Sequence, residues 1–228
     1  MTTIIAETNP WLCEWIRPTS NFHLLHYKNM PIQTQLQLEE ELLRSTRDNW
    51  FLINEGSSVA IVMGISGKAD ELIHLDLAEQ NQIPILRRFS GGGTVIVDEH
   101  TLFTTWICEK SRFPFPAFPE PIMRWVGSVY QEALQHPQFA LRDNDFVIGE
   151  RKIGGNAQYI KKDRWLQHTS FLWDYRPERM RYLKHPPKTP AYREGRSHEE
   201  FLSRLADHFE DKEKLVSSLK TVAHHQPF

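Results

Sequence analysis

Residues 87–94 read Arg-Arg-Phe-Ser-Gly-Gly-Gly-Thr and join two predicted strands. Three consecutive glycines lose much backbone entropy on folding, so an ordered run of them indicates positive φ angles or a close approach of the backbone to another group. Bare amide N–H groups with a guanidinium beside them suit a carboxylate or another small anion. The same residues also suit a glycine bulge between edge strands with two solvated arginines, so the stretch alone leaves both interpretations open.

The surroundings of the glycines exclude two nucleotide-binding motifs. A β-branched run at residues 94–97 follows them, whereas a dinucleotide-binding fingerprint requires a helix at that point. Residues 64–68 read Gly-Ile-Ser-Gly-Lys, which lacks the four-residue gap and the hydroxyl after lysine that a P-loop needs.

Outward from this stretch, the chain alternates between strand and helix patterns. Strands are predicted at residues 22–27, 50–54, 59–63, 83–88, 94–98, 102–108, 139–142, 145–149, 156–160 and 164–173, and helices at residues 34–44, 69–80, 123–134 and 201–209. Residues 55–58 and 161–163 predict hairpin turns, while Thr34 with Gln37 and Ser197 with Glu200 predict capping boxes. We expect the last ten residues to fray. The pattern as a whole predicts one continuous α/β unit.

A second informative segment lies at residues 144–158. Its lysine, Lys152, is followed by two glycines and, after Asn156, by an alanine, so little side-chain bulk would separate the ammonium from a ligand. A lysine near a β-turn is also commonly a solvated turn residue, and the segment alone does not decide between these interpretations.

Composition narrows the class of protein. The chain has 228 residues, 27 Lys and Arg against 29 Asp and Glu, and 40% hydrophobic residues, which is enough to bury a core but lacks the basic excess of a nucleic-acid binder. No apolar run is long enough to span a bilayer, and the N-terminus has no basic region before its short apolar pair. We therefore expect a cytoplasmic protein with neither a nucleic-acid nor a membrane partner.

Several unlike motifs agree in order and spacing. The Arg-Arg-Phe-Ser-Gly-Gly-Gly-Thr run is followed by Asn144-Asp145, by Gly-x-x-Lys-x-x-Gly-x-Ala at residues 149–157 and by His-Thr-Ser-Phe-Leu at residues 168–172. In this the chain resembles the lipoate–protein ligase A family, within the wider biotin/lipoate ligase and octanoyltransferase superfamily. The resemblance covers about residues 33–175, and residues 190–202 resemble a subgroup. It implies an α/β (α+β) fold, a mixed and largely antiparallel β-sheet flanked by helices around one deep site.

The resemblance also implies a reaction in two steps. ATP, with Mg²⁺, would convert lipoate or octanoate to an acyl-adenylate, and a lysine of an apo lipoyl domain would then displace AMP. The implied acceptors are lipoyl domains of 2-oxoacid dehydrogenase acyltransferase subunits and the H protein of the glycine-cleavage system. The sequence does not choose between lipoate and octanoate, and it assigns no metal ligands.

Site residues carry over where the motifs match. Lys152 matches the family's central lysine, which would stabilise charge in both steps without forming a covalent bond. The implied substrate- and adenylate-binding residues are Arg88, Ser90, Gly91, Gly92, Gly93, Thr94, Asp98, Asn144, Asp145, Gly155, Asn156, Ala157 and His168. A lone strand histidine is also commonly a hydrogen-bonded core residue. Apolar residues at positions 59–63 would wall an acyl tunnel, although core packing predicts the same residues.

Two runs depart from the family pattern. Residues 96–100 read Ile-Val-Asp-Glu-His where the family shows an aromatic residue, His-Asp and Gly-Asn, so only Asp98 keeps its register. Residues 65–68 replace an Arg-Asn-Gln group with Ile-Ser-Gly-Lys.

The resemblance also predicts the domain organisation. We expect residues 1–228 to form a single catalytic domain with its core at about residues 22–183, a C-terminal helical segment at about residues 184–228 and no C-terminal accessory domain. Bacterial-type ligases carry such a domain of roughly a hundred residues. A separate accessory chain is one way to supply it.

Two other functions stay open. The first is an octanoyl or lipoyl transferase that uses no ATP and forms a thioester on a cysteine near the central lysine. The chain has two cysteines, Cys13 and Cys108, neither next to the lysine motif, and both suit burial as small hydrophobic residues. The second is a non-catalytic lipoate-binding protein, which would keep the same lysine.

Overall fold

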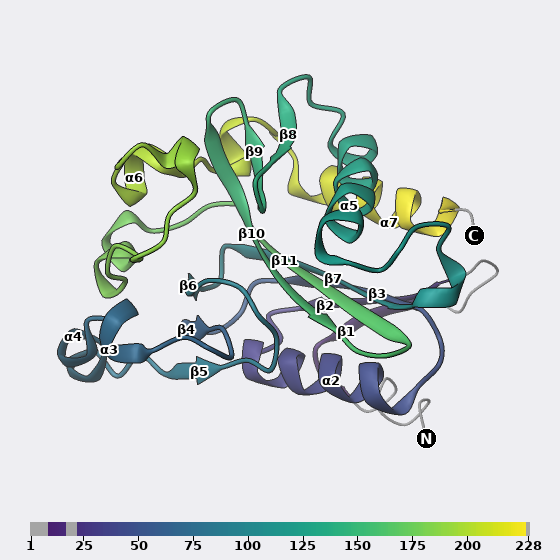
Figure 1. Ribbon diagram of the computed structural model, residues 1–228, viewed down its shortest axis with the longest axis horizontal. Coiled ribbons are helices and arrows are strands. Elements are labelled where there is room, and N and C mark those ends of the chain that lie inside the picture. Colours follow the sequence, from purple (N-terminus) through teal and green to yellow (C-terminus); the bar gives the residue numbers. More distant parts are fainter. Residues whose placement is uncertain (1–8, 17–21, 227–228) are drawn as a thin grey trace.

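The computed structural model describes residues 9–16 and 22–226, and its main element is a sheet of eight strands (Figure 1). Their order is β1-β2-β3-β7-β11-β10-β9-β8. The strands are β1 (Leu12–Ile16), β2 (His23–Lys28), β3 (Trp50–Glu55), β7 (Thr101–Glu109), β8 (Phe139–Arg142), β9 (Asp145–Ile148), β10 (Arg151–Ile160) and β11 (Arg164–Leu172). Only the β2–β3 pair of this sheet is parallel, so the expectation of a mixed, largely antiparallel sheet is confirmed. The predicted turn at residues 161–163 joins β10 to β11.

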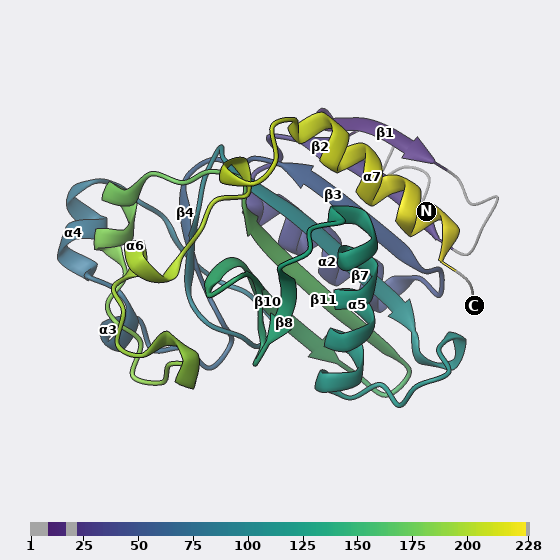
Figure 2. The same cartoon turned by 90° about the horizontal axis from the view of Figure 1, so that it is seen from above.

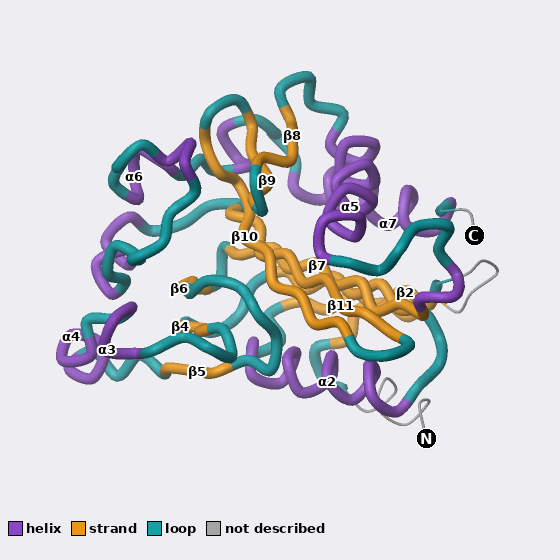
Figure 3. The backbone as a smooth tube through the Cα atoms, viewed as in Figure 1, coloured by secondary structure: helices purple, strands orange, loops and turns teal. Residues whose placement is uncertain are grey.

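A smaller sheet stands beside the large one (Figure 3). It has the order β5-β4-β6, with β4 at Ala60–Met63, β5 at Ile85–Arg87 and β6 at Val95–Val97. The predicted hairpin between residues 50–54 and 59–63 is therefore wrong, because β3 and β4 lie in different sheets. Both edges of β3 are already hydrogen-bonded, to β2 on one side and to β7 on the other, so no edge is left for β4.

Helices cover both faces of the large sheet (Figure 2). The α-helices are α2 (Ile32–Ser45), α3 (Ala69–Leu72), α4 (Leu75–Gln80), α5 (Pro119–Leu134), α6 (His198–Phe201) and α7 (Lys212–His225). Short 3₁₀ helices are η1 (Lys110–Arg112), η2 (Pro177–Tyr182), η3 (Ala191–Arg193) and η4 (Leu205–Asp207).

Four predictions about helices need correction. The single helix predicted at residues 69–80 is two short helices, α3 and α4, because the backbone at Ile73 is extended and forms a β-bridge with Leu183. Helix α2 begins after Pro31 rather than at Thr34, so the predicted capping box is absent, and the Ser57 hydroxyl instead accepts a hydrogen bond from the Ile32 amide at 2.8 Å. The Ser197–Glu200 capping box is present, but α6 ends at Phe201, so no α-helix fills residues 201–209. Most of the last ten residues belong to α7, which Asp211 caps by accepting hydrogen bonds from two backbone amides.

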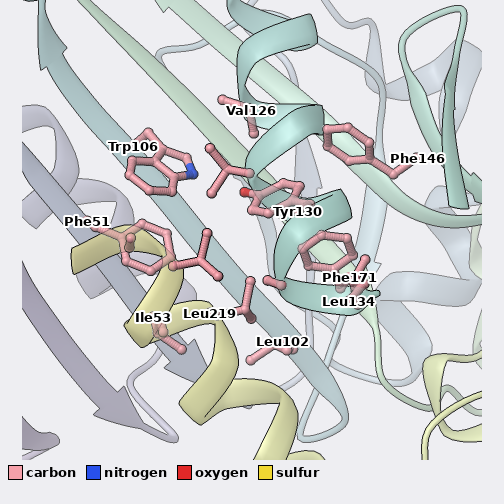
Figure 4. Packing of buried hydrophobic residues seen from close by; sticks show 14 of the residues in the cluster. Phe51, Ile53, Leu102, Trp106, Val126, Tyr130, Leu134, Phe146, Phe171 and Leu219 are labelled. Carbon is pink, nitrogen blue, oxygen red and sulfur yellow. The ribbon is translucent and has the colours of Figure 1, made fainter. Parts of the chain in front are cut away.

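The face of the large sheet under α5 and α7 holds the largest hydrophobic cluster (Figure 4). Because successive strand residues point to opposite faces, Phe51 and Ile53 of β3 join this cluster while Leu52 packs on the α2 side. Tyr130 of α5 lies edge-on to Phe146 and Phe171, which fixes the helix across β9 and β11. We call this surface the covered face.

The opposite face packs against α2 through Leu38, Leu42 and Leu43. Strand β1, whose residues show no clear strand pattern, extends the sheet beyond β2 with a register shift between Leu12 and Glu14. No helix among residues 9–16 and 22–226 is both long and apolar enough to cross a membrane.

Candidate active site

A cavity of about 1820 Å³ lies where the small sheet, strands β10 and β11 and the chain from residue 184 to 202 come together. Residues 184–202, the C-terminal strap, contribute one wall. The strap carries cavity-lining residues of four kinds, namely cationic (Lys184, Lys188, Arg193), uncharged polar (Thr189, His198), prolyl (Pro186, Pro187, Pro190) and apolar (Phe201, Leu202). The sequence motifs that predicted the site lie before this segment.

One end of the cavity is apolar. Its wall includes Ile32 and Leu36 of α2 together with Val62, Val97 and Phe103, which form one buried cluster. Of the β4 residues predicted to wall an acyl tunnel, Val62 lines the cavity. Its neighbours Ile61 and Met63 point the other way, into a different cluster, because side chains alternate along a strand.

Each glycine of the 91–93 run has a different environment. Gly92 has φ +115°, and a Cβ there would lie 2.6 Å from the Asn156 carbonyl oxygen, so the loop is pressed against β10. The Gly91 amide donates to the Gln158 carbonyl at 2.9 Å. A Cβ at Gly93 would meet nothing within 4 Å, and this residue lines the cavity. The glycine run was expected to bring the backbone close to another group. At Gly91 and Gly92 that group is strand β10 of the same chain.

Arg88 organises that loop from inside. Its guanidinium donates to the carbonyl oxygens of Gly93 at 2.7 Å and Gly91 at 3.1 Å, and only 5% of the residue is exposed. Burial lowers the pKa of Arg88 to about 10, although attraction to Glu39 opposes the shift. Arg88 also lines the cavity, so one side chain holds the loop and places positive charge beside the ligand space.

Three predicted site residues are not among the described residues that line the cavity, namely Ser90, Gly91 and Asp98. Asp98 accepts a hydrogen bond from the His100 amide at 2.9 Å and forms an ion pair with Arg179. Its carboxylate is thus committed to a turn and to η2. Thr94 does line the cavity, and its buried hydroxyl has no hydrogen-bond partner among the described residues.

Lys152 lies at the polar part of the cavity. Its ammonium is 2.7 Å from Asp145 Oδ1, and the other carboxylate oxygen of Asp145 accepts a hydrogen bond from Tyr192 Oη at 2.9 Å. Tyr192 belongs to the strap; burial, followed by the nearby Asp145 charge, raises the pKa of its hydroxyl. The backbone carbonyl of Lys152 accepts from the Ser203 amide at 2.9 Å. Lys152 is therefore held at both its side chain and its main chain.

The short residues after Lys152 leave space around its ammonium. A Cβ at Gly155 would lie 3.6 Å from Lys152 Nζ and 3.7 Å from Ser170 Oγ. Asn156 donates to the Asn144 carbonyl at 2.9 Å and accepts from Thr169 Oγ1 at 2.8 Å, which fixes the loop before β9 against β10. The predicted residues Asn144, Asp145, Gly155, Asn156 and Ala157 all line the same cavity as Lys152.

His168 also lines the cavity, and the structure adds a partner that the sequence did not reveal. Its Nδ1 lies 2.9 Å from Oε1 of Glu39, a carboxylate of α2 with no exposed surface. Glu39 accepts further hydrogen bonds from Gln35 Nε2 at 2.8 Å and Thr105 Oγ1 at 2.7 Å. The signal was available, because Glu39 is three residues from both Leu36 and Leu42 on the buried side of α2.

The strap adds two further cationic or titratable groups that sequence reasoning missed. Arg193 is 4% exposed, stacks over Phe201 and donates to the Arg196 carbonyl at 2.9 Å. Burial, followed by the charge of Arg193, lowers the pKa of His198 to about 4, so this histidine is neutral near pH 7.

Neither cysteine lines the cavity. Cys108 is fully buried in the covered-face cluster, and burial raises the pKa of its thiol. Cys13 is exposed on β1. Among the described residues, His, Cys, Asp and Glu side chains form no group of three or more suited to a metal ion.

Comparison with known proteins gives a family match over most of the chain. The model of the lipoyl protein ligase A/B catalytic domain matches residues 31–222. The chain is 24% identical over 233 residues to the inactive lipoate–protein ligase 2 of Plasmodium falciparum, covering 82% of this chain and 59% of that protein. It is 33% identical over 127 residues to the lipoate-protein ligase LplJ of Bacillus subtilis, covering 54% of this chain and 36% of that protein. The matches thus span little more than half, or about a third, of these relatives.

Solved structures share the fold. A crystal structure of lipoate-protein ligase A bound with ATP superposes with a TM-score of 0.72 at 21% identity, covering 87% of this chain and 82% of that one. A bi-partite lipoate protein ligase of Thermoplasma acidophilum, studied with its E2 lipoyl domain, gives a TM-score of 0.74 at 19% identity, covering 90% and 82%.

Proposed function

This chain belongs to the lipoyl protein ligase A/B catalytic domain family, and we propose that it is a lipoate–protein ligase. It activates lipoate or octanoate with ATP to an acyl-adenylate and transfers the acyl group to a lysine of an apo lipoyl domain. The observation that carries this proposal is one cavity that is lined both by an apolar cluster and by Arg88, Lys152 and the glycine loop. That arrangement suits an apolar chain ending in a carboxylate.

The first step joins two anions, so fixed positive charge is its main requirement. The carboxylate oxygen attacks the α-phosphorus of ATP, and pyrophosphate leaves with the electron pair of the broken P–O bond. The Lys152 ammonium, oriented by Asp145 at 2.7 Å, is suited to stabilise the charge that develops at phosphorus. Because the strap and β9 already hold this ion pair, little reorganisation is needed in the transition state.

The second step replaces AMP by the acceptor amine. The carboxylate alone would not react, since its leaving group would be oxide, and adenylation supplies a better one. Lys152 would again stabilise charge, on the carbonyl oxygen and on the departing phosphate. Mg²⁺ stays a prediction. It is commonly held by nucleotide phosphates with one or two carboxylates, and Asp143 is a cavity-lining carboxylate outside the ion pairs described above.

The acceptor and accessory partners are proposals on the same basis. The Thermoplasma acidophilum relative is bi-partite and was studied with an E2 lipoyl domain. We therefore propose apo lipoyl domains as acceptors. We also propose that a separate accessory chain increases the rate of acyl transfer. A cytoplasmic location stays an expectation from the sequence.

Transfer through a cysteine thioester is less well supported. The buried position of Cys108 and the place of Cys13 on β1 keep both thiols away from Lys152. We expect Cys13→Ser and Cys108→Ser proteins to keep their activity, whereas a thioester transferase would lose it through one of them.

A non-catalytic binding protein is the second candidate, and the inactive Plasmodium falciparum relative favours it. Intact-mass spectrometry of an apo lipoyl domain, after incubation with this chain, lipoate, ATP and Mg²⁺, separates the two. A ligase adds one lipoyl group only when ATP is present. If neither a mass gain nor pyrophosphate release occurs, even with an accessory chain, the ligase proposal is wrong.

A further inference from the structure

The stretch at residues 190–202, whose sequence resembles a subgroup of the family, places a buried arginine in the wall of the cavity. Arg193 belongs to η3, lines the cavity and is 4% exposed. Burial of a charged side chain is unfavourable unless other groups balance its charge and accept its hydrogen bonds. The contacts of Arg193 therefore indicate what this part of the strap does.

The protein holds Arg193 in one position. Its amide donates to the Pro190 carbonyl at 3.0 Å, and its Nε donates to the Arg196 carbonyl at 2.9 Å. The guanidinium carbon lies 4.9 Å from the centre of the Phe201 ring, so the planar group is stacked as well as hydrogen-bonded. A side chain that is already ordered loses little conformational freedom when it binds a ligand.

No carboxylate balances the charge of Arg193. Among the described residues it forms no ion pair, and its other polar contact is a long one, 3.5 Å from Nη2 to His198 Nδ1. His198 is neutral near pH 7, because burial and the charge of Arg193 lower its pKa to about 4. The second terminal nitrogen of Arg193, Nη1, has no hydrogen-bond partner in the described part of the chain and is not enclosed by protein atoms. A buried cation with a free donor beside a cavity indicates a site for an anion.

Arg193 lies at the same polar part of the cavity as Lys152. The preceding residue, Tyr192, donates to one oxygen of Asp145 at 2.9 Å, and the other oxygen is 2.7 Å from Lys152 Nζ. Burial lowers the pKa of Arg193, and the charge of Asp145 opposes that shift. His198 in turn is within reach of the charges of both Arg193 and Lys152. Because such interactions weaken with distance, these groups surround one small region.

Charge balance indicates which anion Arg193 would bind. Lys152 and Asp145 form an ion pair with no net charge, and Arg88 directs both of its terminal nitrogens to backbone carbonyls. The carboxylate of the acid loses its negative charge when it is adenylated. The α-phosphate, in contrast, is anionic in ATP, in the acyl-adenylate and in AMP. It therefore matches a cation that is permanently in place.

We propose that Arg193 binds the α-phosphate of the nucleotide beside Lys152 in both steps; the proposal rests on the proposed ligase function. In the transfer step, the acceptor amine forms the C–N bond and gives its surplus proton to water. The bond between the acyl carbon and the phosphate oxygen breaks, and its electron pair stays on that oxygen. The phosphate thereby gains a second negative charge, which a fixed guanidinium stabilises.

The test compares AMP with adenosine, which lacks the phosphate. In calorimetric titrations we expect Arg193→Gln to weaken AMP binding about 10-fold or more, because a charge-assisted contact is lost. Its affinity for adenosine should stay within about threefold of the wild-type value. Acyl transfer from preformed lipoyl-AMP to an apo lipoyl domain should fall about 10- to 100-fold.

Two further variants make the comparison specific. Arg193→Lys keeps the charge without the planar fork, so its AMP affinity should lie between those of the wild type and Arg193→Gln. If Arg193→Gln does not fold, the same comparison is made with Arg193→Lys, for which AMP affinity alone should fall, by about threefold or more. Arg181→Gln is the matched control, because Arg181 is exposed, stacks on Tyr182 and is not among the described residues that line the cavity. We expect this control to bind both ligands as the wild type does.

Three results would overturn the assignment of Arg193. Equal losses of AMP and adenosine affinity would mean that Arg193 only supports the strap. A wild type that does not prefer AMP to adenosine would have no site for this phosphate. Weaker lipoate binding in Arg193→Gln, with the preference for AMP intact, would assign the guanidinium to the carboxylate of the acid.

Failure of this proposal is distinguishable from failure of the proposed function. If the wild type releases pyrophosphate from ATP and lipoate while the preference for AMP does not depend on Arg193, only the present proposal is wrong. If the wild type releases no pyrophosphate but its preference for AMP is lost in Arg193→Gln, the ligase proposal fails and the phosphate site stands.

Discussion

Two neighbouring residues of β7 show how differently the two faces of the large sheet are built. Thr104 points to the covered face, where its hydroxyl lies 2.6 Å from Tyr130 Oη beside a large hydrophobic cluster. Thr105 points to the α2 side, where it donates to the buried Glu39. The covered face thus supplies apolar burial, while the other face carries a polar network that ends at the cavity. Stability and chemistry are assigned to opposite sides of the same strands.

The largest expected effect on stability comes from a substitution on the covered face. Phe51 is fully buried and lies 4.1 Å from Trp106, measured between ring centroids. We expect Phe51→Ala to lower the free energy of unfolding by about 3 to 5 kcal/mol, because it leaves a cavity in a close-packed cluster. Urea unfolding checks this. A loss below about 1 kcal/mol would mean that this face does not carry the stability assigned to it.

The converse test is Lys152→Ala on the cavity side. We expect acyl transfer to fall about 100- to 1000-fold, since a preorganised charge at the reacting centre is lost. The melting temperature should change by only a few degrees, because the Lys152 side chain is 23% exposed and fills no core space. Lys152→Arg keeps the charge and serves as the control. Wild-type activity in folded Lys152→Ala would refute the mechanism.

An ion pair between Glu55, at the end of β3, and Lys212 of α7 predicts how stability depends on pH. Burial alone would raise the pKa of Glu55, but the His26 hydrogen bond and the charges of Lys212 and Lys28 hold it at about 2. Because the folded pKa is below the unfolded value, this stabilisation is present above about pH 4.5 and is lost as the pH falls toward 2.

We expect this loss to be about 2 kcal/mol after allowance for solvent screening. Unfolding curves between pH 6 and pH 2.5 measure it. Glu55→Gln should start less stable and have a flatter profile in that window; parallel profiles would contradict the assignment.

The smallest effect separates two adjacent glycines. Gly92→Ala would place a methyl group against the Asn156 carbonyl in a left-handed conformation, and we expect a loss of about 1 to 2 kcal/mol in unfolding free energy. Gly93→Ala meets open space, so its stability should stay within about 0.5 kcal/mol of the wild type. Thermal unfolding of both proteins tests this. Equal losses of stability would show that the glycine loop is not packed against β10.

The sequence pattern predicted those features of the fold that depend on residues close together in the chain. Strand alternation found most strands of both sheets, and the glycine run with Lys152 led to one cavity. The β3–β4 hairpin failed because pairing depends on which strand edges remain free, a property of the whole sheet. Helix α7 was missed although Leu215, Leu219 and Val222 recur at helical spacing, so its pattern was available in the sequence.

The site shows the same limit. Motifs identified residues that touch the ligand space, but they could not say that Asp98 would be held by Arg179. Nor could they show that the Arg88 guanidinium would bind loop carbonyls, because those partners are distant in sequence or belong to the backbone. Tyr192 of the strap was missed for the same reason, since its contact with Asp145 spans 47 residues.

The hydrogen bond from the Ser203 amide to the Lys152 carbonyl has a consequence during synthesis on the ribosome. Fifty-one residues (203 − 152) separate the two partners, and at roughly 5 to 20 residues per second they emerge about 3 to 10 s apart. The glycine loop and Lys152 therefore leave the ribosome before the wall that completes their cavity. A nascent chain therefore acquires its ligand space only after the strap has emerged from the ribosome.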